Sequence, residues 1–214
     1  MNSAPNLINE GEYANIKGSD FRIMSLVGIA HFFSHFYIYL LPPLFPFLKT
    51  ALNVSYTELG LLMAVFSGTT GLTQIPFGFL VDRFGAKFIL IAGLAVEGIA
   101  FSCMGFAPGY PFLVALMFLA GAANGVYHPA DYAILSASVS KTRMGRAFSL
   151  HTFGGYAGFA VAGPVIIFLN STIGWIFCIL ICGVAVIVTE FELILYYLDF
   201  KHTVQRRDKV IHQK

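Results

Sequence analysis

Five ionisable side chains lie in stretches of this sequence that are otherwise apolar. His31 and His35 share one stretch, and His151 lies in another. His128 and Asp131 lie in a third, which reads GVYHPADYAILS. Imidazole changes its charge near neutral pH, so such residues suit proton relay and the binding of polar solutes. Because burying an unpaired ionisable group is costly, we interpret these residues as candidates for a substrate-binding or proton-coupling site.

The elements that must position these side chains are long apolar segments. Of the 214 residues, 57% are hydrophobic and 11% are charged, whereas a soluble domain carries about 25% charged residues. A membrane-spanning helix needs about 20 mostly apolar residues. Six segments meet this requirement: 21–48, 57–81, 87–106, 110–135, 146–169 and 172–198. The sequence therefore predicts an all-α, polytopic bundle of six transmembrane helices.

The segments outside this bundle of residues 21–198 are polar. Residues 1–20 lack the basic start and apolar core of a cleavable signal, so we predict a cytosolic leader. Residues 199–214 are predicted to be a basic cytosolic tail or the start of a central loop. All basic residues except Lys49 fall on one side of the predicted bundle. Because positive charge accumulates on the cytosolic side, we expect a multi-pass protein of the plasma (inner) membrane with both termini in the cytosol.

The two histidines of the first predicted helix should act together. His31 and His35 are four residues apart and therefore project from one helix face. They lie about 15 to 21 Å along the helix from Phe21, near the middle of the membrane. Substrate contact and proton relay are the functional interpretations. The alternative is a pair of neutral histidines bonded to neighbouring helices.

The short loop between the fourth and fifth predicted helices makes them antiparallel neighbours. This arrangement brings His128, Asp131 and His151 to a similar depth near the cytosolic side. Pro129 has no amide hydrogen and should disturb the helix there. We interpret the region as a kinked, polar inner rim of a cavity, in which Asp131 holds a proton or pairs with His151 or Arg146. An ordinary cap at the helix end is the alternative.

Two further polar side chains lie at membrane depth. Glu97, in the third predicted helix, is expected to be structural, either protonated or bonded to Gln74, with a coupling role as the alternative. Asn124 lies beside Gly121 and Gly125, which favour close helix packing. Asn124 is also a candidate to face a substrate cavity.

A charged motif connects the second and third predicted helices. The sequence GFLVDRFGAK contains Gly78, Asp82, Arg83, Gly85 and Lys87. Glycine permits close helix approach and backbone angles that other residues resist. This spacing, in this loop, resembles the signature of the major facilitator superfamily. The resemblance implies that these five residues form a loop that takes part in conformational change.

Three longer stretches resemble the fosmidomycin-resistance-type branch of that superfamily: HFFSHFYIYLLPPLFPFL, GVYHPADYAILS and GRAFSLHTFGGYAGFAVAGP. Ala130 stands where the branch usually has an acid after His-Pro, and Asp131 follows it. The resemblance implies two six-helix halves around a central cavity, of which this chain supplies the N-terminal one. The second half is either further sequence or a second copy of the chain.

The function expected from these observations is secondary active transport of a small organic solute by alternating access, coupled to protons. The candidate substrate-binding or proton-coupling residues are His31, His35, Asn124, His128, Asp131 and His151. The expected partners are the solute, protons, the lipid bilayer and a second six-helix half or second copy.

Other functions were weighed against transport. A non-transporting membrane subunit or sensor that needs a partner half is the main alternative. The spacing of His31 and His35 also resembles one box of membrane di-iron oxygenases, but the chain has only 6 histidines. A haem held by histidines of two helices is a further alternative. We expect no enzyme, no cofactor, no metal site and, with a net charge of +2, no nucleic-acid binding.

Overall fold

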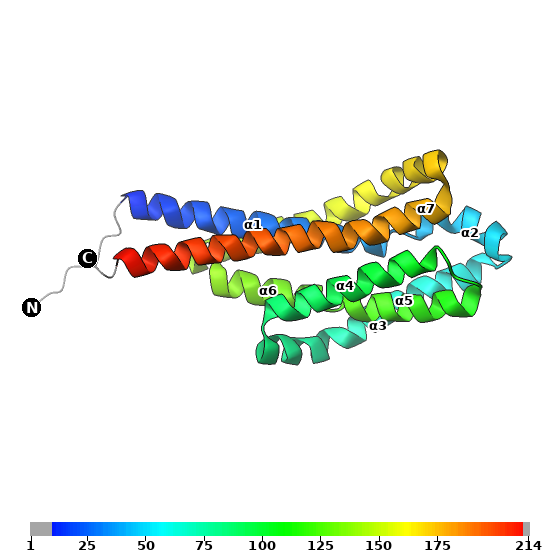
Figure 1. Cartoon of the computed structure of the whole chain (residues 1–214), viewed down its shortest axis with the longest axis horizontal. Helices are drawn as coiled ribbons and strands as arrows, with labels where there is room; N and C mark the ends of the chain where they lie inside the picture. Colours follow the sequence, from blue (N-terminus) through cyan, green and yellow to red (C-terminus); the bar gives the residue numbers. More distant parts are fainter. Residues whose placement is uncertain (1–9, 212–214) are drawn as a thin grey trace, which may run out of the picture.

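The protein is a bundle of long helices that run roughly along one axis (Figure 1). The computed structural model describes the backbone of residues 10–211 and the side chains of most residues between 18 and 188. This architecture confirms the all-α class. The elements are, in order, α1 (Glu10–Ile38), η1 (Pro42–Leu44), α2 (Phe45–Leu52), α3 (Tyr56–Phe84), α4 (Ala86–Met104), α5 (Tyr110–Asn124), α6 (Tyr127–Ser138), η2 (Lys141–Arg143) and α7 (Met144–Ile211).

The first predicted span is divided into two helices. Helix α1 begins at Glu10, well before the predicted start, and ends at Ile38. Pro42 and Pro43 follow, and because proline has no amide hydrogen to donate, the chain forms the short η1 turn before α2. The expected domain division, with a separate leader at residues 1–20, stays a prediction.

The fourth predicted span is interrupted at Gly125 and Val126, between α5 and α6. Pro129 lies in the first turn of α6 and cannot donate to the carbonyl of Gly125, four residues earlier. The expected disturbance of the helix before Pro129 is therefore confirmed. The interruption turns the first residues of α6 relative to α5.

The fifth and sixth predicted spans form α7, which reverses direction at Gly174 (Figure 1). Gly174 has φ of 79° and ψ of 162°, a backbone conformation that favours glycine. The predicted turn at residues 170–171 was therefore placed too early. Those residues are helical, and the Ser171 hydroxyl donates to the Phe168 carbonyl of the preceding turn at 2.8 Å.

Membrane-spanning potential extends through most of the described chain. Four segments are long and apolar enough to cross a membrane: Gly18–Leu52, Ala86–Met104, Tyr110–Ser138 and Lys141–Ala185. The last of these folds back at Gly174, and α3 has 29 residues, which is also a sufficient length. Helix α3 is not among the four segments that are both long and apolar enough, so the number of six spans stays a prediction.

Three threonines of helix α3 donate their hydroxyls to backbone carbonyls: Thr69, Thr70 and Thr73. Thr70 Oγ1 donates to the Gly121 carbonyl at 2.9 Å, and Thr73 Oγ1 donates to the Ala122 carbonyl at 3.1 Å. A Cβ at Gly121 would collide with the Phe66 carbonyl, so the two helices touch through their backbones. The predicted close packing at Gly121 is confirmed, and it fixes α5 against α3.

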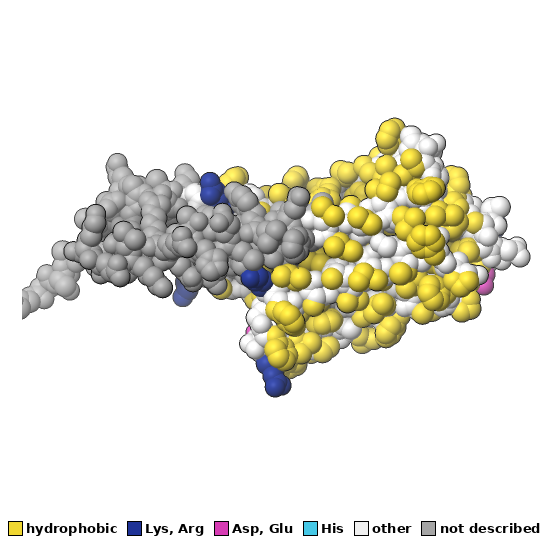
Figure 2. Space-filling view, in the orientation of Figure 1, with side chains coloured by type: hydrophobic (Ala, Val, Ile, Leu, Met, Phe, Trp, Pro, Cys, Tyr) yellow, Lys and Arg dark blue, Asp and Glu magenta, His cyan; other side chains and the backbone are white. Residues whose placement is uncertain are grey.

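The ends of the bundle differ in charge. Figure 1 places the start of α1, the α3–α4 turn and the ends of α6 and α7 at one end, and α2 and the Gly174 bend at the other. Lysine and arginine side chains gather near the first end in Figure 2. At that end Asp20 Oδ2 accepts from Arg143 Nη1 at 2.9 Å and from Ser140 Oγ at 2.6 Å. These bonds attach α1 to the loop from which α7 begins.

Candidate functional site

Five of the six predicted site residues meet in one group, which we call the histidine cluster. Helix α1 supplies His31 and His35, α6 supplies His128 and Asp131, and α7 supplies His151. His31, Asp131 and His151 are buried, whereas His35 and His128 are half-buried. The cluster is therefore reachable from outside through its two half-buried members.

His31 lies at the centre of the cluster. Its ring centroid lies 4.4 Å from that of His35, 5.0 Å from that of His128 and 3.6 Å from that of His151. The His31 and His151 rings are stacked, with an interplanar angle of 18°. The predicted shared face of His31 and His35 is confirmed. The cluster extends this pair with rings from two other helices.

Asp131 is fully buried and faces two of these rings. Its Oδ2 lies 3.1 Å from His151 Nε2, within hydrogen-bond distance, and 3.7 Å from His31 Nδ1. Of the two partners considered for Asp131, the structure therefore selects His151. Arg146 instead lies on an exposed surface of α7.

The histidine cluster holds polar atoms that make no hydrogen bond. Among the described residues, four buried side-chain atoms lack a partner, and they are His31 Nδ1, His35 Nδ1, His128 Nδ1 and Asp131 Oδ1. All four belong to this cluster. Buried polar groups are usually paired, so a concentration of unpaired ones is typical of a site that binds something.

Close contact between α1 and α7 brings the rings together. A Cβ at Gly154 would collide with the Gly28 carbonyl, and one at Gly158 with the Phe32 carbonyl. A Cβ at Gly155 would lie 2.8 Å from a ring atom of His31 and 2.9 Å from one of His35. The absence of side chains at these positions therefore leaves the space that the imidazoles occupy.

Asn124, the sixth predicted site residue, lies in a separate group that we call the glutamate network: Ser34, Glu97, Asn124 and Tyr127. Asn124 Nδ2 donates to Glu97 Oε1 at 3.0 Å and to Ser34 Oγ at 3.3 Å. Tyr127 OH donates to Glu97 Oε2 at 3.1 Å. The expected bond between Glu97 and Gln74 is wrong, because the interruption after Asn124 directs Asn124 and Tyr127 to the carboxyl instead.

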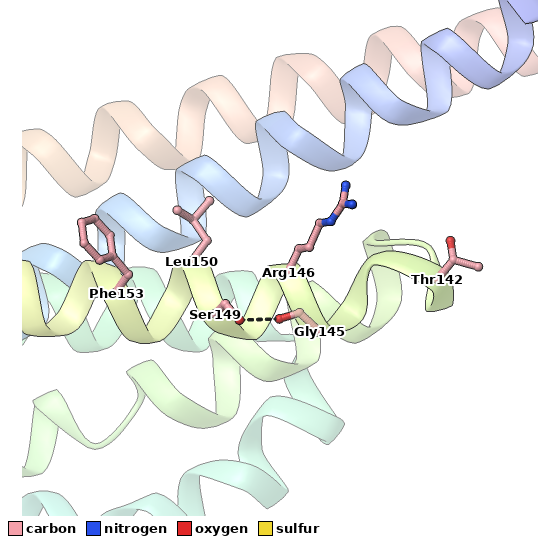
Figure 3. Close-up of a pocket in the computed structure, with 6 residues that line it drawn as sticks. All are labelled: Thr142, Gly145, Arg146, Ser149, Leu150 and Phe153. Carbon is pink, nitrogen blue, oxygen red and sulfur yellow. Dashed lines mark hydrogen bonds between the residues drawn. The ribbon is translucent and has the colours of Figure 1, made fainter.

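A groove runs along the first turns of α7 (Figure 3). It has a volume of about 600 Å³ and is lined by Thr142, Gly145, Arg146, Ser149, Leu150 and Phe153. Arg146, Leu150 and Phe153 extend to the same side of the helix in Figure 3. Ser149 Oγ donates to the Gly145 carbonyl at 2.9 Å. Arg146 is the one charged residue of this lining.

The charged loop motif lies at the α3–α4 turn. Gly85 has φ of 89°, which confirms the expected need for glycine there. Gly78 differs from expectation, since a Cβ there would meet no atom within 4 Å among the described residues. Arg83 lies over the Phe84 ring, 5.3 Å from its centroid. The conformational role of Asp82, Lys87 and the rest of the motif stays a prediction.

Sequence reasoning missed some neighbours of the cluster. The Tyr132 ring lies 5.6 Å from that of His128 and 5.4 Å from that of His151. Its position four residues after His128 is a signal that could have identified it. The Phe159 ring lies 4.4 Å from that of His35. No local pattern indicates that contact, since it depends on how α7 packs against α1.

Comparison with known proteins identifies relatives along most of the chain. A probable sulfoacetate transporter of Cupriavidus necator is 26% identical over 170 residues, covering 79% of this chain and 39% of the relative. An uncharacterised transporter of the major facilitator type from Bacillus subtilis is 24% identical over 140 residues, covering 65% of this chain and 34% of the relative. A D-galactonate transporter of Escherichia coli is 22% identical over 131 residues, covering 61% of this chain and 30% of the relative. The chain thus spans between 30% and 39% of these relatives.

A solved structure shares the fold. It is the outward-facing state of a bacterial homologue of the iron transporter ferroportin, with a TM-score of 0.66 and 14% identity. The match covers 93% of this chain and 49% of that one. At this identity the likeness shows the fold alone.

The sequence pattern of the Major Facilitator Superfamily matches residues 27–212. This match covers all six predicted spans except the first few residues. It confirms that the chain is not an enzyme and that it is a multi-pass integral membrane protein. The chain belongs to the major facilitator superfamily of membrane transporters.

Proposed function

We propose that this chain forms one six-helix half of the pathway of a secondary transporter for small organic anions. The observation that carries the proposal is the histidine cluster, a buried group of imidazoles with unpartnered nitrogens inside an apolar bundle. Two of the relatives are named for sulfoacetate and D-galactonate. Both compounds are small anions with a carboxylate, which imidazole N–H groups bind well.

The groove on α7 supports the same substrate class. Arg146 places a permanent positive charge beside Ser149 and Thr142, at the charged end of the bundle. A guanidinium attracts carboxylates and can bind them with two parallel hydrogen bonds. The groove runs along the same stretch of α7 that carries the buried His151, so an anion held in it lies beside the helix that supplies the cluster.

Several finer expectations accompany this proposal and do not carry it. Coupling to protons, cytosolic termini, the second half or second copy, and the fosmidomycin-resistance-type branch all remain predictions from the sequence. The relatives described above are named for other compounds, so they favour organic acids over that branch. A non-transporting subunit remains the alternative function.

The test is anion uptake into liposomes that contain the purified protein. We expect accumulation of labelled D-galactonate or sulfoacetate and none of galactose, the matched uncharged sugar. Arg146→Gln should lower the initial uptake rate at low anion concentration by about tenfold, because a charged site concentrates its ligand. Lys141→Gln, a charge change outside the groove lining, is the control. Equal uptake of galactose would contradict the proposal, and a folded protein that transports neither anion would favour the non-transporting subunit.

A further inference from the structure

We propose that His31, His35 and His128 form a binding site for a divalent transition-metal ion, with three nitrogen ligands and an open fourth position. Each of these residues offers one ligand atom, and the three atoms lie within 4.8 Å of one another. They come from two different helices, α1 and α6. Three histidines with a free coordination position are a common arrangement around zinc in proteins.

The hydrogen bonding of the three residues points to a missing ligand. Each has a buried Nδ1 atom that makes no hydrogen bond with any described residue. A buried histidine held only for packing normally has its ring nitrogens paired with a carbonyl, a carboxylate or water. Three such atoms in one cluster are explained together if a metal ion accepts lone pairs from these imidazoles.

A second set of ligand atoms overlaps with the first, and the geometry favours the first. His31, Asp131 and His151 also place one ligand atom each within 4.8 Å of one another. However, Asp131 and His151 already face each other at 3.1 Å, and the His151 ring is stacked on His31. An ion at the second set would have to break that contact. Asp131 and His151 therefore serve better as an outer layer that holds His31 in place.

The charge balance is favourable for a cation at this depth. Asp131 Oδ2 lies 3.7 Å from His31 Nδ1, so a buried carboxylate lies beside the central ligand. An ion in a low-dielectric interior needs such a nearby opposite charge. The half-buried exposure of His35 and His128 provides the route by which the ion enters.

The ligand types limit the choice of metal. Imidazole suits zinc, copper, nickel and cobalt, whereas magnesium and calcium select oxygen ligands. The nitrogens around a tetrahedral zinc lie about 3.3 Å apart, given bonds of about 2.0 Å. The three rings would therefore move slightly closer by side-chain rotation. Gly155, which has no Cβ, already lets the rings of His31 and His35 pack against α7, so the adjustment needs rotation of the rings and not more room.

The proposal departs from the sequence expectation of no metal site. The sequence places His31 and His35 in one pair and His128 in a separate set with Asp131 and His151, so it does not bring the three proposed ligands together. The fold adds His128 from a helix about a hundred positions later in the chain. The site does not depend on the proposed transport of organic anions, because the ion would bind to the purified protein without any substrate.

The test is Co²⁺ titration of the purified full chain, followed by the visible ligand-field absorption. Both tail histidines are first replaced, His202→Gln and His212→Gln, so that the cluster supplies all remaining imidazoles. We expect one Co²⁺ per chain by native mass spectrometry. His35→Gln and His128→Gln should each weaken binding by at least about 100-fold, the upper end of what losing an outer-layer partner costs. The matched variant His151→Gln should weaken it less, by about tenfold, the lower end of the cost of losing an outer-layer partner.

A second measurement needs no change in the cluster. X-ray absorption of the Zn²⁺-loaded tail variant should show three imidazole nitrogens around the metal. Fewer than three nitrogens, or no Co²⁺ binding by a folded tail variant, would overturn the proposal. Binding that is lost in His151→Gln but kept in His35→Gln would overturn it in favour of the set with Asp131.

Discussion

The bundle contains two buried polar groups that are built in opposite ways. In the glutamate network, both carboxyl oxygens of Glu97 accept hydrogen bonds, from Asn124 and from Tyr127. In the histidine cluster, three imidazole nitrogens and Asp131 Oδ1 have no partner among the described residues. The two groups share helices α1 and α6, so they experience a similar surrounding.

This difference separates a packing role from a binding role. A fully bonded polar network holds helices in one arrangement, because each group would be left unpaired if a helix moved. A cluster with unpaired groups contributes little to stability by itself and gains its partners from a ligand. We therefore expect changes in the glutamate network to affect folding, and changes in the histidine cluster to affect binding.

The largest effect on stability is expected at Glu97. Glu97→Ala removes one hydrogen bond of the Asn124 amide and one of the Tyr127 hydroxyl, and the loss of each buried bond to a carboxyl costs about 1–3 kcal/mol. The free energy of unfolding in detergent, measured by denaturant titration, should fall by about 2–4 kcal/mol. Co²⁺ affinity of the folded fraction should stay near that of the parent protein, since Glu97 contacts none of the three proposed ligands.

Glu97→Gln provides the matched comparison. The amide oxygen keeps one acceptor and the side chain keeps its volume, so the loss of stability should be smaller than in Glu97→Ala. Equal losses in the two variants would mean that the carboxyl does not hold the network together. A loss below about 1 kcal/mol in Glu97→Ala would contradict the contrast between the two groups.

An intermediate effect is expected at Gly155, where packing and the cluster meet. Gly155→Ala adds a methyl group against the rings of His31 and His35, with contacts of 2.8 and 2.9 Å before any adjustment. Overpacking of this kind costs about 1–3 kcal/mol, and Co²⁺ binding should weaken as well because the rings are displaced. Gly163→Ala is the control, since a Cβ there meets no atom within 4 Å. Unchanged stability and binding in Gly155→Ala would contradict the ring positions described here.

The smallest effect on stability, and of opposite sign, is expected at His35. His35→Phe replaces a ring of similar shape, keeps the contact with Phe159 and removes a buried unpaired nitrogen. Stability should rise by up to about 1 kcal/mol, while Co²⁺ binding is lost. Thermal unfolding and Co²⁺ titration of the same sample measure both. A clear loss of stability would show that His35 Nδ1 is paired in the folded protein.

Local sequence patterns predicted a large part of this architecture. Spans and the charged loop follow from the length and composition of single segments, and Gly85 adopts the positive φ that the loop motif suggested. The common depth of Asp131 and His151 followed from a short loop between two antiparallel helices, whereas the choice of His151 over Arg146 as the partner came from the structure. The break before Pro129 followed from a missing amide hydrogen. Each of these depends on residues close together in the sequence, or on one connection.

By itself, the sequence determined the six apolar spans, the shared face of His31 and His35, and the common depth of His128, Asp131 and His151. Only the tertiary structure decided that these two sets form one cluster, that Glu97 binds Asn124 and Tyr127 rather than Gln74, and that the last reversal occurs at Gly174. The physical reason is that helical periodicity is a local property of 3.6 residues per turn. The partner of a buried side chain depends instead on which helices touch, and here backbone contacts at Gly154 and Gly158 bring α7 against α1.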